Sequence, residues 1–267
     1  MRARDVLAAT AISASALLVA VGAIVALVLL APGEDRPVFA GEPRFVVTWA
    51  EESGEIADEQ RAMRRDGAVA GAVADLNRVV ELPRHVEVRV RSCDFGTSFD
   101  GWDERIDLCV DESASARDEL AEAGDPDPDA TVLRIWRETV MHEAAHALVQ
   151  LHDLEHEGSE EDLADSFAAW MLLRDGDVED VDALVAAALQ YDVWAGLYES
   201  DTSDGHSTDA VRAANYACWV LGAHPERAEE LAPVDSLRVS RVPGCADELR
   251  RLERDWESRF ELMDAGG

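Results

Sequence analysis

The sequence contains no lysine, so its 24 basic residues are all arginines, and they are set against 56 acidic residues in a chain of 267. The formal net charge at pH 7 is therefore -32. A surface with this excess of carboxylates repels the phosphates of DNA and RNA, which argues against nucleic acid as a partner. The charge suits solubility in a salty medium and does not by itself identify a function.

The sequence also lacks closely spaced cysteine pairs, which argues against a zinc ribbon or a Cys-x-x-Cys redox centre. Its four cysteines are Cys93, Cys109, Cys218 and Cys245. In an oxidising compartment the two pairs closest in sequence, Cys93–Cys109 and Cys218–Cys245, are expected to form disulfides among three possible connectivities. Free buried thiols are the alternative.

Charged residues are missing from one long segment, Val6–Ala31, which follows two arginines. As a helix this segment would be about 39 Å long, more than the roughly 30 Å hydrocarbon core of a bilayer. The apolar region of a cleaved signal peptide is shorter, about 7–15 residues. We predict a single transmembrane anchor in residues 1–31 with a cytoplasmic amino terminus, a linker over 32–43, and an exported domain over 44–267. A cleaved signal sequence and a secreted domain are the alternative.

Strand patterns come first along the exported part and helical patterns come later, which is typical of an α+β fold. Alternation or strand composition occurs in residues 45–49, 85–91 and 105–110. We expect a helix over residues 56–80, with Gly67 and Gly71 weakening its middle. A second helix is expected over residues 113–123, and a mainly helical chain after Glu160. The segment Ser92–Asp103 is expected to be a loop that borders the functional site.

A His-Glu-x-x-His pattern, His142-Glu143-Ala144-Ala145-His146, lies in a segment with helical periodicity. The apolar positions of that segment recur at three- and four-residue steps, namely Leu133, Trp136, Val140, Ala144, Ala147 and Leu151. Asp129, which follows a proline-rich turn, can cap the start of the helix. On such a helix His142 and His146 lie one turn apart on the same face.

Two neutral imidazoles one turn apart can hold a zinc ion (Zn2+), and the glutamate between them can act as a general base. Zinc lowers the pKa of a coordinated water to about 7. We therefore predict that His142 and His146 bind zinc and that Glu143 takes the proton of the attacking water. For so short a motif, a surface helix with two solvated histidines is the alternative.

A catalytic zinc site needs a third protein ligand, and two candidates compete. His152 follows His146 by the spacing of a longer three-histidine motif, but that motif turns sharply at a glycine, where this chain has the β-branched Val149. The second candidate is Glu161, with Asp165 one turn further on to accept a hydrogen bond from a ligand histidine. Glu160 is close enough in sequence to replace Glu161 as the ligand.

Several segments together resemble a bacterial domain-of-unknown-function family of metallopeptidases. They are residues 142–148, 160–165, 204–207 and 215–222, with earlier matches at 76–77, 82–83, 93 and 106–109. The resemblance covers roughly Phe45 to Phe260, nearly all of the expected exported part. It implies a zincin-like fold, in which a small β-sheet packs on the His-Glu-x-x-His helix and a mainly helical C-terminal half follows.

The Glu-x-x-Ala-Asp pattern of residues 161–165 is similar to that of the gluzincins, whose zinc is held by two histidines and a glutamate. This similarity favours Glu161 over His152 as the third ligand. Gluzincins also place a later histidine or tyrosine near the zinc to stabilise the oxyanion of the reaction. The resemblance thus implies this role for His206, with Tyr216 or Asn215 as alternatives.

Together these features predict an exported, membrane-anchored zinc metalloendopeptidase of gluzincin type that acts on peptide or protein substrates. The alternative is a non-catalytic extracytoplasmic binding or assembly domain in which the zinc is structural. The intact Glu143 favours catalysis, because a structural zinc site has no need of a general base.

Overall fold

The computed structural model describes residues 39–94, 96–199, 202 and 205–266. The chain divides into two compact units, residues 1–40 and 41–267, and the fold described here is that of the second unit. The predicted transmembrane anchor, residues 1–31, lies outside the described residues. Within the described part, no helix combines the length and the apolar character needed to cross a bilayer.

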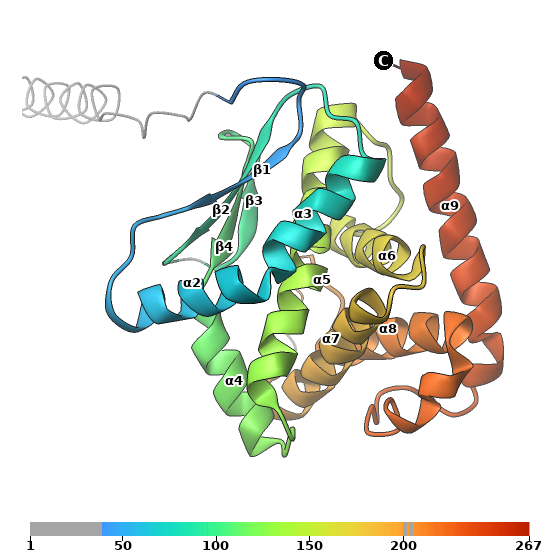
Figure 1. Cartoon of the computed structure of the whole chain (residues 1–267). Helices are drawn as coiled ribbons and strands as arrows, with labels where there is room; N and C mark the ends of the chain where they lie inside the picture. Colours follow the sequence, from blue (N-terminus) through green and yellow to red (C-terminus); the bar gives the residue numbers. More distant parts are fainter. Residues whose placement is uncertain (1–38, 95, 200–201, 203–204, 267) are drawn as a thin grey trace, which may run out of the picture. The chain divides into compact units, whose positions relative to one another are not determined.

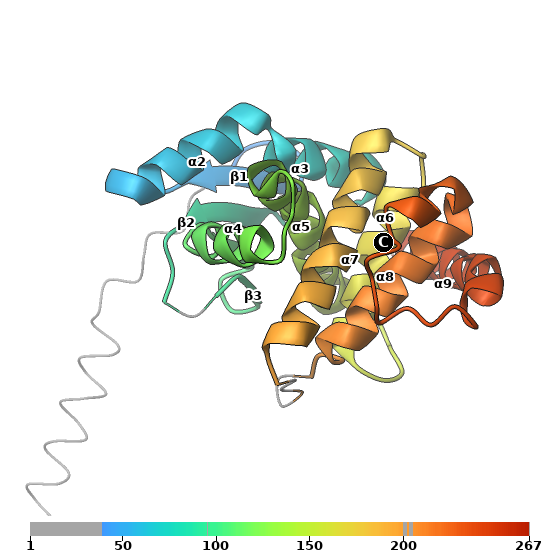
Figure 2. The same ribbon diagram turned by 90° about the horizontal axis from the view of Figure 1, so that it is seen from below.

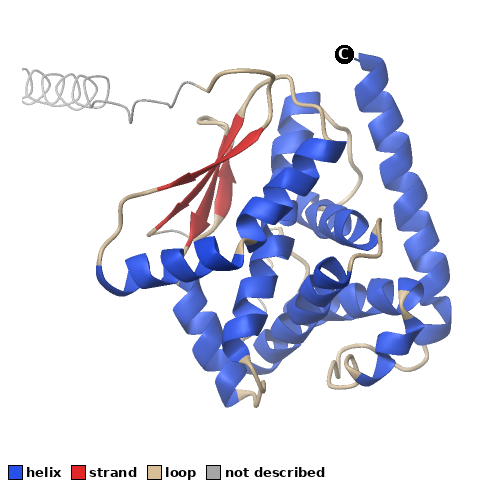
Figure 3. Cartoon of the chain, viewed as in Figure 1, coloured by secondary structure: helices blue, strands red, loops and turns tan. Residues whose placement is uncertain are grey.

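The strands form one four-stranded sheet with the order β1-β2-β4-β3 (Figure 3). They are β1 (Phe45–Trp49), β2 (Val86–Arg91), β3 (Ser98–Asp100) and β4 (Arg105–Cys109). β1, β2 and β4 run parallel to one another, whereas β3 at the edge is antiparallel to β4. In β2, buried valines alternate with half-buried polar residues, so one face of the sheet packs on the core.

The predicted helix over residues 56–80 is instead two helices, α2 (Gly54–Asp66) and α3 (Ala68–Val79). Gly67 between them has a φ of 86°, in the left-handed region that favours glycine. Its N–H donates to the carbonyl oxygen of Met63 at 3.0 Å and so ends α2. The prediction of one helix is wrong, because the helical pattern continues on both sides of a residue that interrupts the backbone.

The predicted loop over residues 92–103 contains the edge strand β3. This strand has only three residues, which are too few to show an alternating pattern. The chain then passes through β4 and α4 (Glu112–Glu122) toward the motif helix, and both β3 and α4 contact that helix.

The motif helix is α5 (Pro128–His152), and its N-cap is Asp127, not the predicted Asp129. The Asp127 carboxylate accepts a hydrogen bond from the backbone N–H of Ala130 at 3.2 Å. Pro128 occupies the first helical position, where no intrahelical N–H is needed. Asp129 instead lies in the first turn and pairs with Arg117 of α4.

The C-terminal half is helical, as predicted. It comprises α6 (Glu160–Leu173), α7 (Val178–Leu197), α8 (Asp209–Ala223) and α9 (Cys245–Gly266), with 3-10 turns at Pro225–Glu229 and Val242–Gly244. Figures 1 and 2 both show α5 between the sheet and these helices. α5 contacts α3, α4, β3 and β4 as well as α6 and α7. The α+β prediction is confirmed, and the motif helix is the element that both halves share.

Two disulfides hold the chain, Cys93–Cys109 and Cys218–Cys245. The first ties the segment after β2 to the end of β4. The second joins α8 to the start of α9, where Gly222 allows close approach, since a Cβ there would lie 2.7 Å from the carbonyl oxygen of Cys245. Disulfides form in oxidising compartments, so this pair is compatible with an extracytoplasmic location.

Opening the Cys93–Cys109 bridge is expected to weaken the domain measurably. The bridge closes a loop of 16 residues, and its loss in the double variant Cys93→Ser/Cys109→Ser should lower the free energy of unfolding by about 3 kcal/mol. Urea unfolding followed by circular dichroism measures the difference. Mass mapping that finds free thiols at these two positions in the native protein would contradict the assignment.

Candidate metal centre

The motif residues occupy the middle of α5, where the helix is almost entirely buried. His142 and Glu143 are only 6% and 7% exposed, and Ala144 and Ala145 between the two histidines are buried as well. Their neighbours Val140, Met141, Ala147 and Leu148 belong to the hydrophobic core. The site is therefore set in the best-packed part of the domain, where side-chain positions are well determined by their contacts.

A sharp turn brings α6 back against the motif helix. Gly158 in that turn has a φ of 86°, and the Ser159 hydroxyl caps α6 by accepting a hydrogen bond from the N–H of Glu161 at 3.1 Å. The first two turns of α6 thereby direct three carboxylates toward the two motif histidines, those of Glu160, Glu161 and Asp165.

Three side-chain atoms converge at one point between α5 and α6. Glu161 Oε2 lies 3.2 Å from the Nε2 atoms of both His142 and His146, and these two Nε2 atoms are 3.4 Å apart. In a tetrahedral zinc site with bonds of about 2.1 Å, neighbouring ligand atoms are about 3.4 Å apart. The spacing therefore fits a zinc ion held by two imidazoles and one carboxylate.

The outer nitrogens of the same histidines are held by two other carboxylates. His142 Nδ1 lies 2.9 Å from Asp165 Oδ1, and His146 Nδ1 lies 2.7 Å from Glu160 Oε1. In the neutral rings each Nδ1 donates its proton to the carboxylate, so each Nε2 presents a lone pair. Three acceptor atoms then face one another at close range, an arrangement that a cation between them stabilises.

These contacts separate the three candidates for the third ligand. Glu161 reaches the Nε2 atoms, whereas Glu160 contacts the outer nitrogen of His146 and the ring of His156. The ring of His152 points elsewhere, with Nε2 3.0 Å from the backbone oxygen of Glu81. Only Glu161 among them is placed as a ligand would be.

A buried network behind His142 fixes its orientation. Asp165 accepts two hydrogen bonds from Arg212 of α8, at 2.7 and 2.8 Å, and is only 3% exposed. Burial alone would raise the pKa of Asp165, but Arg212 and His142 outweigh burial and hold that pKa below its usual range. Without a bound metal ion, burial would lower the pKa of His142, but hydrogen bonds with Asp165 and Glu161 favour the protonated ring and raise that pKa to about 10. A metal ion would take the place of the proton on Nε2.

Tyr216 extends this network to Glu138, which lies one turn before His142 on α5. The Tyr216 hydroxyl is 2.5 Å from Glu138 Oε1 and 3.0 Å from Asp165 Oδ1. The single hydroxyl proton of Tyr216 cannot be donated to both carboxylates. Both contacts are hydrogen bonds when Glu138 is protonated and donates to Tyr216, and Tyr216 donates to Asp165. In agreement, burial raises the pKa of Glu138 above its usual value.

Glu143 differs from these paired carboxylates. Its side chain is buried, lines the cavity described below, and takes part in no hydrogen bond within the described part of the chain. Burial raises the pKa of its carboxyl group, while His142 and His146 act in the opposite direction. A carboxylate that is buried but uncommitted is suited to exchange a proton with a bound reactant.

His206 reaches the site from the loop before α8. Its Nε2 lies 2.9 Å from Glu161 Oε2, and its ring stacks on that of His142 with centroids 5.9 Å apart. The hydroxyl of Ser159 donates to the carbonyl oxygen of the neighbouring Gly205, which fixes this loop against α6. The two alternatives for the predicted role of His206 are engaged elsewhere, Tyr216 in the buried network and Asn215 with Arg241.

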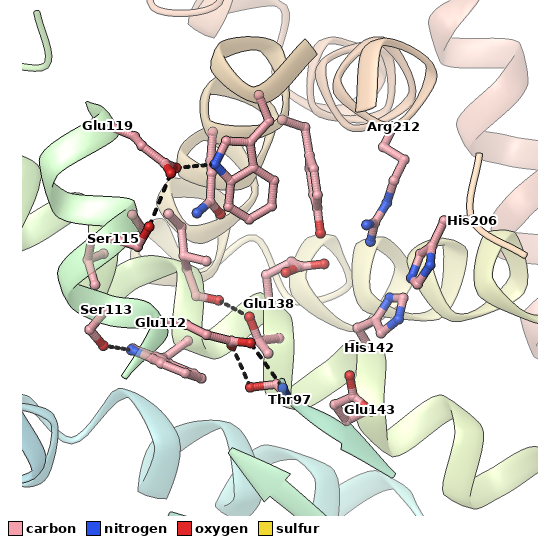
Figure 4. A pocket seen from close by; sticks show the side chains of 18 of the residues that line it. Thr97, Glu112, Ser113, Ser115, Glu119, Glu138, His142, Glu143, His206 and Arg212 are labelled. Carbon is pink, nitrogen blue, oxygen red and sulfur yellow. Dashed lines mark hydrogen bonds between the residues drawn. The ribbon is translucent and has the colours of Figure 1, made fainter. Parts of the chain in front are cut away.

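A cavity of about 440 Å³ opens beside the metal centre. His142, Glu143 and His206 lie at one end, and the wall continues along α5 between α4 and α7 (Figure 4). A volume of this size is typical of a pocket that binds a small molecule or a peptide side chain.

The roles of three residues of the site are not predicted from the sequence. Arg212 and Glu138 carry no motif, and Glu160 is predicted only as a substitute ligand. Arg212 pairs with a residue 47 positions away, so only the packing of α8 on α6 brings the two together. A signal was nevertheless present for Glu138, since a glutamate four residues before a motif histidine must lie on the same buried face.

A His-Glu-x-x-His helix whose histidines converge with a glutamate from the next helix, next to an uncommitted buried carboxylate, is the arrangement of a metal-dependent hydrolase. Comparison with protein families agrees with this class. The chain belongs to the family described as "Putative metallopeptidase", whose sequence model matches residues 50–260. The predicted family resemblance is thus confirmed. No curated protein and no solved structure matches the chain.

Proposed function

We propose that the domain is a zinc-dependent peptidase of the gluzincin type, with a zincin-like fold and with His142, His146 and Glu161 as metal ligands. The observation that carries the proposal is the convergence of three acceptor atoms beside the Glu143 carboxylate, which has no hydrogen-bond partner among the described residues. The distances between these three atoms are close to those between neighbouring ligand atoms in a tetrahedral zinc site. The family to which the chain belongs supports peptides as the substrate class.

In the proposed mechanism, a zinc ion held by His142, His146 and Glu161 would supply Lewis acidity toward the scissile carbonyl and would lower the pKa of the attacking water. Glu143 accepts the proton of that water and passes it to the departing amine. His206 donates a hydrogen bond to the oxyanion that forms on the carbonyl oxygen. Asp165 and Glu160 keep the Nε2 atoms of the ligand histidines directed at the site, by accepting hydrogen bonds from Nδ1.

The edge strand offers a place for the main chain of the substrate. β3 is the last strand of the sheet order and contacts α5, and Thr97 just before it lines the cavity at the metal centre. An extended peptide can pair with the outer edge of such a strand. Its scissile bond would then run past Glu143.

We also propose that the domain works outside the cytoplasm, attached to the membrane through residues 1–31. The uncharged segment Val6–Ala31 behind two arginines supports the anchor, and the two disulfides support an oxidising compartment.

Metal analysis of the purified full chain tests the ligand set. We expect one zinc ion per chain in the wild type, and a reduction of about tenfold or more in His142→Ala and in Glu161→Ala, because two protein ligands rarely retain zinc. His152→Ala and Glu157→Ala are matched controls, since neither residue contacts the Nε2 atoms, and both should keep one zinc ion.

Two results would contradict the proposal in different ways. Zinc retained in Glu161→Ala would remove Glu161 from the ligand set and leave the histidines in place. A wild-type chain that binds no zinc even after reconstitution would rule out the metal centre itself.

A further inference from the structure

The cavity beside the metal centre is a groove along α5. Its wall includes His142, Thr139, Ile135 and Val132, which follow one another at three- and four-residue steps toward the start of the helix. At about 1.5 Å per residue this stretch covers roughly 15 Å of the helix surface. A substrate side chain that leaves the metal centre along this groove must be long to reach its far end.

The walls of the groove are largely apolar and aromatic. Trp136 and Ile135 of α5 face Ala116 of α4 and Tyr191 and Trp194 of α7. Such walls suit the methylene stem of a long side chain, and the ring of Trp194 can stack on a planar cation. The ring of Tyr191 already lies against Arg212, whose Cζ is 4.0 Å from the ring centroid.

A carboxylate stands at the far end of the groove. Figure 4 shows Glu119 and Ser115 on one side of the cavity, and His142, Glu143 and His206 on the other. Glu119 accepts hydrogen bonds from Trp194 Nε1 at 2.5 Å, from the Tyr198 hydroxyl at 2.5 Å and from the Ser115 hydroxyl at 3.1 Å. Three donors fix its position.

All three of these donors are neutral, and no arginine pairs with Glu119 in the described part of the chain. An arginine of the same helix and an arginine that lines the cavity both have other partners. Arg117 of α4 pairs with Glu59 and Asp129, and Arg212 is held by Asp165. The negative charge of Glu119 is thus oriented but not compensated by a cation, as in a site that receives one.

A second polar group faces the groove without a partner. Gln190 of α7 is only 5% exposed and lines the cavity, and its side-chain amide forms no hydrogen bond among the described residues. Because this amide lines the cavity and has no partner among the described residues, a ligand in the groove can pair with it. Its carbonyl oxygen is an acceptor that can add to the carboxylate of Glu119.

We propose that this groove is the specificity pocket of the enzyme and that it selects peptides with an arginine next to the scissile bond. The inference rests on the proposed peptidase function. A guanidinium is planar, carries five donors and stacks on aromatic rings, so it matches a carboxylate, an amide oxygen and an aromatic wall better than a compact ammonium does. Glu119 and Gln190 are the recognition residues, and Trp194 flanks the cation.

The test uses the zinc-loaded full chain and quenched fluorescent peptides that differ at one position. Arginine, lysine, citrulline, norleucine and phenylalanine are compared in turn on each side of the scissile bond. Citrulline is the decisive comparison, because it has the shape of arginine without the charge. We expect kcat/KM for the arginine peptide to exceed that for the citrulline peptide at least about tenfold on one side.

Glu119→Gln links the preference to this pocket. The substitution should lower kcat/KM for the arginine peptide about tenfold and bring the arginine-to-citrulline ratio close to one, with unchanged zinc content. Glu122→Gln, at an exposed position of the same helix, is the matched control and should keep the wild-type ratio. A wild-type ratio near one, or a preference for phenylalanine, would overturn the proposal even if Glu119→Gln failed to fold.

Binding separates failure of the pocket from failure of the proposed function. Calorimetry with the zinc-loaded Glu143→Gln variant compares the arginine peptide and the citrulline peptide directly. Tighter binding of the arginine peptide, in a protein whose wild type cleaves no peptide, would support the pocket and reject the peptidase. Cleavage of all peptides alike, with equal binding, would support the peptidase and reject the pocket.

Discussion

Replacing Glu143 by glutamine is expected to reduce kcat for peptide hydrolysis about 10³-fold while one zinc ion stays bound. The amide keeps the shape of the side chain but cannot accept a proton from water, and general-base catalysis typically contributes 10²–10⁴-fold. Because Glu143 is not among the atoms that converge at the metal centre, zinc content should not change. The measurements are initial rates on a quenched peptide and metal analysis of the same preparation.

A neighbouring carboxylate provides the control for this experiment. Glu157, in the turn between α5 and α6, is exposed, and Glu157→Gln should keep the wild-type rate. A Glu143→Gln variant with less than about a tenfold loss would remove Glu143 as the base. A wild-type protein that binds zinc but cleaves no peptide would favour the alternative of a binding or assembly domain with a structural metal.

The parts of this site that can be predicted from the sequence are those defined by local spacing. His142 and His146, four residues apart on a helix, must share a face, and so must Glu161 and Asp165 on the next one. The apolar stripe of α5 locates its buried side for the same reason. Once Gly158 is recognised as a turn, the return of α6 against α5 follows from chain length alone.

The parts that could not be predicted depend on packing between distant elements. Arg212 and Tyr216 reach Asp165 because α8 packs on α6, and no pattern in either helix indicates that partner. Likewise the groove exists because α4 and α7 flank α5. Gln190 and Trp194 share one face of α7, and Tyr198 follows directly after the helix, but that face could equally have met the core.

At the helix boundaries, too, some features follow from the local sequence and others do not. Proline and aspartate signals place the start of α5 within two residues, yet Asp127 and Asp129 are both chemically able to cap it, and only the backbone geometry at Asp127 selects between them. At Gly67 the helical pattern is continuous, and the break comes from a backbone conformation that the pattern does not record.

Replacing Arg212 by methionine should destabilise the domain by about 3–5 kcal/mol. Methionine keeps the unbranched apolar stem of arginine but has no charge, so Asp165 would remain buried beside His142 without its main cationic partner. Removing one member of a buried ion pair typically has this cost. Urea unfolding of the zinc-free protein measures the loss. Arg134→Met, at an exposed position of α5, should change the stability by no more than about 0.5 kcal/mol.

A double variant shows whether the loss comes from the uncompensated charge. In Arg212→Met/Asp165→Asn the carboxylate is replaced by a neutral amide whose oxygen can still accept the Nδ1 proton of His142. We expect this variant to be more stable than Arg212→Met alone by at least about 1 kcal/mol, because the buried charge is gone and the hydrogen bond is kept. If Arg212→Met costs less than about 1 kcal/mol, or if the double variant is the less stable of the two, the network does not depend on this ion pair, and the orientation of His142 must be set by the packing of α5 and α6.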